Sequence, residues 1–571
     1  MKHFFHSFLG TICAIIVLMV LTFAIGSCVV GQKPKIEDNS WLIVEMAGDL
    51  LEYNPPGGIM SEITGGEVET LTRILGNLEK AAVDDRVEGV IFKVSMDSAS
   101  GFAKIEEIRG AIKDLQESGK KVYAWAESFS DREYPLLAAC DEIYIPPTAY
   151  ISFKGVGMEM MHVKNALDKL GIKPNVHKIK DYKSAAELVI RADSSEPAKE
   201  NRRWLMNDVL DEFHRILLEE RGLDRPKVEE LMQHALFTGE EALEAGLVDG
   251  LKYWDELEAG LKQEDEDELV TLAQGRYAEV DPGKLGLEGD SKIAVIHAQG
   301  TIIGRTSGVN PLLGITMGHE SIVAEFRRAR MDEDVAAIVF RVDSGGGDAL
   351  GSDLMGHEVE VTAGVKPVVV SMVDVAASGG YHIAYRSTHM MADPMSIVGS
   401  IGSINGKFNM KGFYDKLGIT YDTLEFGPMA LLDSDLRDYT PEEKARVEED
   451  HWAGFNAWLQ DVADHRDMTF EEAEKLAHGR VFTGRQALEN GLIDELGDMA
   501  RAIEVARELA EIPADDKVTV EHFPIKTGPL QAILGGDDAA SAAANWLIYR
   551  SVRERASETM EILASRTEQV Y

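Results

Sequence analysis

The chain has little of what metal centres, disulfide scaffolds and nucleic-acid surfaces need. Its 571 residues include three cysteines, Cys13, Cys28 and Cys140, whose spacing matches no zinc motif. An HExxH motif, a P-loop and an EF-hand loop are all absent from the sequence. Lys and Arg number 58 against 98 Asp and Glu, a formal net charge of −40. Because phosphate binding needs a basic surface, we expect no nucleic-acid partner, and we expect no metal, cofactor or disulfide framework.

Long apolar runs are also scarce, except at the N-terminus. No residue from Phe8 to Val30 is charged, and these 23 residues are long enough to cross a bilayer as one helix. We predict that residues 1–35 form a retained transmembrane signal anchor. A cleaved signal peptide is one alternative, and lipidation at Cys28, after the box "IGSC", is another. All three interpretations export the remaining chain from the cytoplasm.

What the chain does have is an internal duplication. The stretch "DKLGI" occurs at 168–172 and again at 415–419, an offset of 247 residues. Similarly, "FTGEEALEAGLVD" at 237–249 matches "FTGRQALENGLID" at 482–494. Ordered matches at nearly one spacing indicate two copies of one unit. We therefore divide the chain into the anchor (1–35), a first repeat (38–260), a linker (261–290), a second repeat (291–513) and a C-terminal extension without a counterpart in the first repeat (514–571).

Each copy alternates short β-rich runs with longer helical patterns. The runs "VAAIVFRV" (335–342) and "KPVVVSMV" (366–373) are almost continuously apolar, which is typical of parallel strands buried on both faces. Residues 348–365 between them are long enough for a crossover helix. The predicted class is α/β with repeated strand–helix units. In the extension, residues 544–566 have the spacing of an amphipathic helix, which favours packing on this chain or a sister subunit over a membrane.

The two copies have lost different residues. At the offset of 247, Ser378 in "AASGGY" lies opposite Asp131, so the first copy lacks the serine and the two glycines that follow it. In the other direction, Lys183 in "DYKSAAE" lies opposite Ala430 of the second copy. One copy keeps a serine and the other keeps a lysine. This complementarity predicts that the two copies jointly build one site.

The segments "AASGGY", "DYKSAAE", "GSIG" and "GRVFTGRQALENGLIDELG" resemble signal peptide peptidase A in its long form, over about residues 40–513. That family is a membrane-anchored serine protease with two tandem domains, and its fold is similar to the Clp protease and crotonase fold of repeated ββα units. The resemblance implies that Ser378 is the nucleophile and that Lys183 is the general base. It also implies that Ser400, which replaces Phe153 of the first copy, orients the lysine amine.

Lysine can act as a base only when it is neutral. Its ordinary pKa is about 10.4, and burial without a carboxylate partner lowers that value. The surroundings of Lys183 must therefore be dry and free of a paired Asp or Glu. Glu187, four residues further on, would keep the lysine charged if it paired with Lys183.

Glycines near the serine are suited to bind an oxyanion. Gly379 follows the nucleophile and is expected to begin a helix, whose N-terminus favours negative charge. Gly346 and Gly347 follow a predicted strand and bring backbone N–H groups close to a ligand, because they carry no Cβ. The family usually has Pro-Gly-Gly where this chain has three glycines from Gly345. We predict Gly379, Gly346 and Gly347 as oxyanion donors.

Two further polar residues near the serine have other interpretations. His382, four residues after the serine, suggests a Ser–His pair, but its apolar neighbours favour a packing or surface role. Asp343 is expected to hold the glycine loop (residues 345–347) rather than to act as an acid. The sequence leaves open whether Ser378 meets Lys183 within one chain or across a subunit boundary.

The resemblance implies a membrane-anchored endopeptidase that degrades remnant signal peptides and other apolar peptides through an acyl-enzyme. It also implies a ring-like homo-oligomer, a tetramer in the long form. The implied location is the bacterial inner membrane, with a single pass and the catalytic body on the periplasmic side. Two other classes remain as alternatives: a crotonase-type acyl-CoA enzyme, and a catalytically inactive scaffold or chaperone.

Overall fold

The structure is a computed structural model that describes residues 36–54, 69–96, 100–263, 267–310 and 313–524. The predicted anchor (1–35) and the amphipathic segment at 544–566 lie outside these ranges. Among the helices within them, none is both long enough and apolar enough to cross a membrane.

The first repeat is built on a six-stranded parallel sheet with the order β10-β1-β2-β3-β5-β9. The strands of this sheet are β1 (Ser40–Met46), β2 (Val87–Val94), β3 (Lys121–Ala126), β5 (Glu142–Ile145), β9 (Gly250–Leu251) and β10 (Thr271–Ala273). A small second sheet has the order β4-β6-β8, from β4 (Phe129–Ser130), β6 (Tyr150–Phe153) and β8 (Ala235–Thr238).

The second repeat has an eight-stranded sheet with the order β20-β18-β16-β15-β11-β22, in which β17 pairs with both β16 and β21. Its strands are β11 (Ser291–Gln299), β15 (Val335–Ser344), β16 (Val368–Ala377), β17 (His389–Ala392), β18 (Ile397–Gly399), β20 (Val481–Thr483), β21 (Glu495–Leu496) and β22 (Val518–Phe523). A small sheet beside it contains β12 (Thr301–Ile302), β13 (Gly308–Asn310) and β14 (Gly314–Met317).

Helices connect the strands of both repeats. In the first they are α3 (Leu71–Val83), α4 (Phe102–Glu117), α5 (Tyr134–Ala138), α6 (Lys164–Leu170), α7 (Glu187–Ile190), α8 (Glu196–Arg221), α9 (Arg225–His234), α10 (Gly239–Glu244), α11 (Trp254–Leu261) and α12 (Gln274–Tyr277). In the second they are α13 (His319–Met331), α14 (Ala349–Ala363), α15 (Gly379–His382), α16 (Lys411–Leu417), α17 (Pro441–His465), α18 (Phe470–Leu476), α19 (Gly484–Glu489) and α20 (Met499–Leu509). Short 3₁₀ turns lie at Ser184–Ala186 and Pro282–Leu285.

The predicted strand–helix–strand unit of the second repeat is confirmed. The runs at 335–342 and 366–373 form β15 and β16, which pair in parallel, and α14 connects them. All residues from Ala337 to Val342 are buried, as expected for a strand covered on both faces. Each repeat has its own large apolar core.

The ends of the repeats differ from the sequence-based division. Residues of the predicted linker form β10, which pairs in parallel with β1. Residues of the predicted extension form β22, which pairs in parallel with β11 in the same way. The expectation that the extension has no counterpart in the first repeat is therefore wrong for β22. Both strands supply backbone hydrogen bonds to an edge of the first strand of their repeat, which would otherwise be unpaired.

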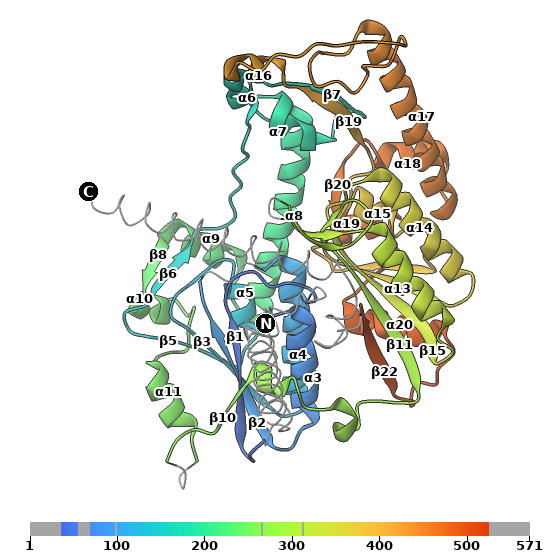
Figure 1. Cartoon of the computed structure of the whole chain (residues 1–571). Helices are drawn as coiled ribbons and strands as arrows, with labels where there is room; N and C mark the ends of the chain where they lie inside the picture. The colour runs from blue at the N-terminus through green and yellow to red at the C-terminus, as the bar shows by residue number, and fades with distance from the viewer. Residues whose placement is uncertain (1–35, 55–68, 97–99, 264–266, 311–312, 525–571) are drawn as a thin grey trace, which may run out of the picture.

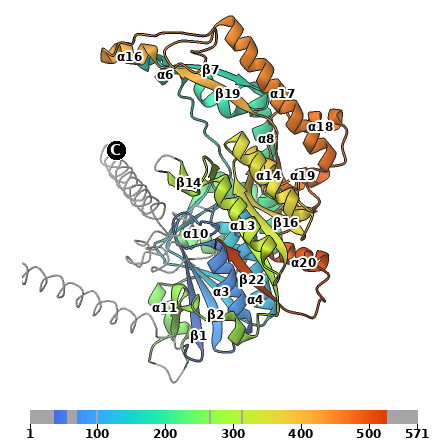
Figure 2. The same cartoon turned by 45° about the vertical axis from the view of Figure 1, so that its right-hand side comes forward.

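The repeats are joined by three segments of the first repeat. Helix α4 lies between the two main sheets and packs on both β3 and β16 (Figure 1). Helix α8 crosses to β20, where Asn201 exchanges two hydrogen bonds, of 2.8 and 3.0 Å, with the backbone of Val481. Strand β7 (Lys173–Lys178) pairs antiparallel with β19 (Ile404–Asn409) of the second repeat. Figure 2 shows this two-stranded sheet beyond the main sheets, between α16 and α17.

Candidate active site

The β7–β19 pairing carries the predicted lysine into the second repeat. Immediately after β7, Ile179 is fully buried in the second repeat's core, and its N–H donates to the carbonyl oxygen of Ser403 at 3.1 Å. Lys183 follows four residues later, at the end of this inserted segment. The chain thus takes a residue of the first repeat into the second by strand pairing and an apolar anchor.

The structure brings Lys183 and Ser378 together within one chain. The Nζ atom of Lys183 lies 2.9 Å from Ser378 Oγ, at hydrogen-bond distance. It also donates to Ser400, to Oγ at 2.9 Å and to the carbonyl oxygen at 3.0 Å. Two serines of the second repeat therefore surround one amine of the first.

The surroundings of Lys183 are dry and free of a carboxylate partner. The residue is 6% exposed, and this burial lowers the pKa of its amine to about 8. Glu187 is turned to other groups: it accepts from Ser195 Oγ at 2.6 Å and forms an ion pair with Lys178 at 3.3 Å. The lysine is thus held where the neutral form is accessible near physiological pH.

Ser378 stands at a strained turn between β16 and α15. Its φ of 57° lies in the left-handed region, where a side chain other than glycine is disfavoured by roughly 1–3 kcal/mol. Its N–H donates to the carbonyl oxygen of Gly399 at 2.7 Å, which ties the turn to β18. The Ser378 hydroxyl makes no capping hydrogen bond to α15. The serine side chain is therefore presented to the lysine and is not used by the helix.

The glycine loop lies directly against this turn. A Cβ on Gly346 would stand 2.4 Å from the Gly379 nitrogen, and one on Gly347 would stand 2.1 Å from the carbonyl oxygen of Ile302. The N–H of Gly346 donates to Ser344 Oγ at 3.1 Å. The N–H groups of Gly347 and Gly379 have no acceptor among the described residues. Two of the three predicted donors thus remain free to bind an oxyanion.

Sequence reasoning missed Gly479, which makes room for the lysine. A Cβ there would lie 2.5 Å from both Cα and Cβ of Lys183, and its φ of 81° also favours glycine. Its N–H donates to the carbonyl oxygen of Ile401 at 2.8 Å. At the offset of 245, the first copy has His234 in its place. The same comparison of copies that singled out the serine could have revealed this glycine.

His382 and Asp343 lie apart from the serine–lysine contact. His382 stacks on Trp458, with ring centroids 4.8 Å apart and an interplanar angle of 8°. Asp343 forms an ion pair with Lys104 of the first repeat, 2.9 Å away. These contacts agree with a packing role for the histidine and with a loop-holding role for the aspartate.

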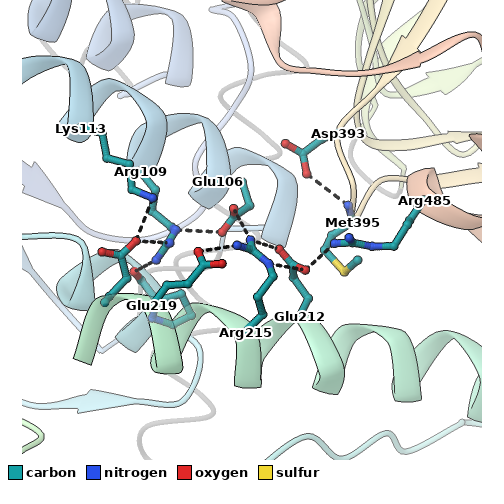
Figure 3. Close-up of polar contacts among 11 residues, drawn as sticks. Glu106, Arg109, Lys113, Glu212, Arg215, Glu219, Asp393, Met395 and Arg485 are labelled. Atoms are coloured by element: carbon teal, nitrogen blue, oxygen red, sulfur yellow. Dashed lines mark hydrogen bonds and ion pairs between the residues drawn. The ribbon is translucent and has the colours of Figure 1, made fainter. Parts of the chain in front are cut away.

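Ion pairs hold α8 against both repeats. Figure 3 shows Arg215 of α8 between Glu106 of α4 and Glu212, while Arg485 of α19 binds the other side of Glu212. Glu212 is buried, so its charge needs these guanidinium partners. The network connects the first repeat to the helix that follows β20 of the second.

Comparison with known proteins agrees with the duplication. The family model "Peptidase family S49" matches residues 114–267 and again residues 360–513. "Serine protease SPPA, chloroplastic" from Arabidopsis thaliana is 34% identical over 473 residues, 82% of this chain and 70% of that protein. "Protease 4" of Haemophilus influenzae is 28% identical over 494 residues, 81% of this chain and 78% of that protein. "Protease 4" of Salmonella typhi is 29% identical, over 78% of this chain and 72% of that protein.

A buried amine beside a strained serine, within a duplicated α/β unit and with these relatives, defines the class of the protein as a serine peptidase. The chain belongs to peptidase family S49, of which it carries two tandem copies.

Proposed function

We propose that the protein is a membrane-anchored serine endopeptidase that cleaves apolar peptides, remnant signal peptides among them, with Ser378 as nucleophile and Lys183 as general base. The observation that carries the proposal is the 2.9 Å contact between the lysine Nζ and the serine Oγ in a buried site without a carboxylate. A neutral lysine has two N–H bonds and one lone pair. With both N–H bonds donated to the two oxygens of Ser400, the lone pair is left to accept the hydroxyl proton of Ser378.

The reaction then proceeds in two halves. Ser378 Oγ attacks the peptide carbonyl carbon while its proton passes to Lys183, and a tetrahedral intermediate forms. The C–N bond breaks as the lysine returns the proton to the leaving amine, which leaves an ester on the serine. Water attacks this ester, Lys183 takes a proton from the water and passes it to Ser378 Oγ, and the acid product departs. The N–H groups of Gly347 and Gly379 bind the oxyanion in both halves, and Gly346 supports the loop.

The proposed anchor at residues 1–35 would hold the peptidase at the membrane, where apolar peptides accumulate. For a bacterial host, we place the catalytic body on the periplasmic side of the inner membrane, with a single pass. "Putative signal peptide peptidase SppA" of Enterococcus faecium, 27% identical over 43% of this chain, supports the substrate class. Alkaline extraction of membranes that contain the full chain tests the anchor, because an integral segment stays in the pellet and a peripheral protein is released.

The function is tested with a fluorophosphonate probe and a quenched apolar peptide. The wild-type protein should be labelled at Ser378 and should cleave the peptide, and Ser378→Ala should do neither. Lys183→Met should lower both rates by roughly a hundred- to ten-thousandfold, because the base is lost. Peptide cleavage by Ser378→Ala would overturn the proposal in favour of another nucleophile. No labelling and no cleavage by the wild type would favour a scaffold, and turnover of an acyl-CoA by Ser378→Ala would favour a crotonase-type enzyme.

We also propose that the chain forms a ring-like homo-oligomer, a tetramer in the implied family. The β7–β19 pairing inside the chain provides a template for the contact. At the offset of 247, the counterpart of β19 is 157–162 in the first repeat, and the counterpart of β7 is 420–425 in the second. Neither counterpart is part of a described sheet. Each chain thus presents two segments that pair with no strand of the described sheets. We call the counterpart of β19 (157–162) the acceptor segment and the counterpart of β7 (420–425) the donor segment.

Both segments expose large apolar side chains to solvent. Met161 is 71% exposed in the acceptor, and Leu424 is 82% exposed in the donor. A hollow of about 580 Å³ lies beside the acceptor and is lined in part by Met158, Met160 and by Lys199, Arg202 and Arg203 of α8. The donor carries Asp422 and Glu425, whose charges complement this lining. If the donor segment of one chain pairs with the acceptor segment of the next chain, both surfaces are covered, and the head-to-tail contacts can close into a ring.

The register of the template makes this contact testable. Lys407 pairs with Asn175 within the chain, so Met160 should pair with Asp422 of a second copy. The double variant Met160→Cys, Asp422→Cys should form disulfide-linked oligomers under mild oxidation. A matched control, Met160→Cys with Lys411→Cys, should not cross-link, because residue 411 lies outside the donor segment. A strictly monomeric protein at micromolar concentration, with no cross-link in the first pair, would exclude the contact.

A further inference from the structure

A buried lysine from the first repeat lies between the two strands that carry the glycine loop and the nucleophile. Lys104, in the first turn of α4, places its Nζ 2.9 Å from Asp343 Oδ2 and 3.1 Å from Asp374 Oδ2. Asp343 lies near the end of β15, shortly before the glycine loop, and Asp374 lies on β16, four residues before Ser378. All three side chains are largely buried, and the lysine is 6% exposed.

The β-ladder between these strands is interrupted at this point. Val342 pairs with Met372, but the next partners are Ser344 and Ala376, so the register shifts across Asp343. Two more residues on β16 than on β15 therefore lie between the paired positions, and the ladder cannot hold the strand ends together there. Lys104 bridges this gap with one positive charge between two carboxylates.

The contact with α4 is closely fitted. A Cβ on Gly101, the N-cap of α4, would stand 1.9 Å from Asp374 Oδ1, so glycine at this position admits the carboxylate. Asp374 thereby reaches the N-terminus of a 16-residue helix, where negative charge is favoured. The first copy has no counterpart of this aspartate pair, because Ser95 and Glu127 stand there at the positions of Asp343 and Asp374.

Hydrogen bonds connect Asp343 to the glycine loop, and the backbone of β16 connects Asp374 to Ser378. The backbone carbonyl of Asp343 accepts from Gly300 N at 2.9 Å, and Ser344 Oγ donates to the Gly300 carbonyl at 2.6 Å. The same Ser344 oxygen accepts from Gly346 N. On the other strand, the chain continues from Asp374 to the strained turn at Ser378 without leaving β16.

We propose that Lys104 is a positioning residue for the peptidase reaction: it ties the glycine loop and the nucleophile turn of the second repeat into one geometry, across the boundary between the repeats. This inference rests on the proposed function of Ser378. The first repeat then contributes two lysines: Lys183 contacts Ser378 directly, and Lys104 holds the strands that position Ser378 and the glycine loop. Lys104 itself contacts neither the serine nor the loop glycines.

The test compares Lys104→Met with Lys104→Arg and with Lys113→Met. Lys113 lies on the same helix, is 48% exposed and pairs with Glu220, so its variant is a matched control. Fluorophosphonate labelling of Lys104→Met should slow at least tenfold. In peptide cleavage by the same variant, kcat should fall by a larger factor than KM rises. The pH midpoint of labelling should stay at the wild-type value, because Lys183 is untouched. Lys104→Arg should recover part of the rate, and Lys113→Met should match the wild type.

Hydrogen exchange adds a readout that distinguishes a local effect from unfolding. In Lys104→Met, amides in peptides covering 343–348 and 373–380 should exchange faster, while β1 and β2 should not change. If Lys104→Met fails to fold, the triple variant Lys104→Met, Asp343→Asn, Asp374→Asn removes the uncompensated carboxylates and should fold with the same slow labelling. Labelling of a folded Lys104 variant within twofold of the wild type would overturn the inference. Absence of Ser378 labelling in the wild type would instead overturn the proposed function.

Discussion

The pH dependence of serine acylation tests the role of Lys183 most directly. Burial places the pKa of the Lys183 amine at about 8, against an ordinary value of 10.5. At pH 7 about a tenth of the molecules then hold the neutral amine, about 300 times more than with an unshifted lysine. In free energy this difference is roughly 3 kcal/mol, which the fold supplies by keeping water and carboxylates away from the amine.

The assay is the second-order rate of fluorophosphonate labelling, measured from pH 5.5 to pH 10.5 at constant ionic strength. Because the base must be neutral, the rate should rise about tenfold per pH unit at low pH and should level off above pH 8. In Lys183→Arg the side chain stays protonated throughout this range, so labelling should be slow at every pH. Far-ultraviolet circular dichroism at each pH confirms that the protein remains folded.

Stability provides an independent measurement of the same pKa. Since the folded state lowers the pKa of Lys183, it binds fewer protons than the unfolded chain between about pH 8 and 10.5. Burial of the charged amine destabilises the folded wild-type protein. This destabilisation is fully present below pH 8 and is lost as the pH rises towards 10.5. The stability of Lys183→Met relative to wild type should therefore fall by roughly 3 kcal/mol between pH 7 and pH 10.5. A labelling profile that is flat, or that bends only near pH 10.5, would refute the reasoning.

Three substitutions test the geometry around the serine and the lysine. Ser400→Ala removes one acceptor of the lysine amine and should lower kcat by about ten- to a hundredfold with little change in KM; an unchanged kcat would remove Ser400 from the site. Gly479→Ala places a Cβ 2.5 Å from the lysine Cα and should reduce peptide cleavage by about a hundredfold. Its control, Gly454→Ala in α17, meets no atom within 4 Å and should keep full activity with a stability gain of about 1 kcal/mol. Gly346→Ala should reduce labelling by about a hundredfold or more, because its Cβ would lie 2.4 Å from the nitrogen that follows the nucleophile. Gly345→Ala, where a Cβ meets nothing, should label normally, and equal rates for the two glycine variants would contradict the predicted role of the loop.

The sequence determined the duplication, the α/β class and the pair of residues that the two copies retain between them. These features are readable because buried parallel strands impose apolar runs, and because a repeat allows one copy to serve as a reference for the other. The same comparison showed a serine without a lysine in one copy and a lysine without a serine in the other. The division of the chain was less accurate at β10 and β22, since a three- to six-residue edge strand has too few residues to show a pattern.

Only the tertiary structure decided how these residues meet. Lys183 and Ser378 are 195 positions apart, and their contact depends on β7 pairing with β19 and on Ile179 entering the second core. The lowered pKa of the lysine is a property of everything that excludes water around it, not of its sequence neighbours. The same holds for the bridge from Lys104 to the two aspartates, which exists only after α4 has packed between the sheets. Desolvation and ion pairing act through distance in space, and a chain's local sequence carries no record of that distance.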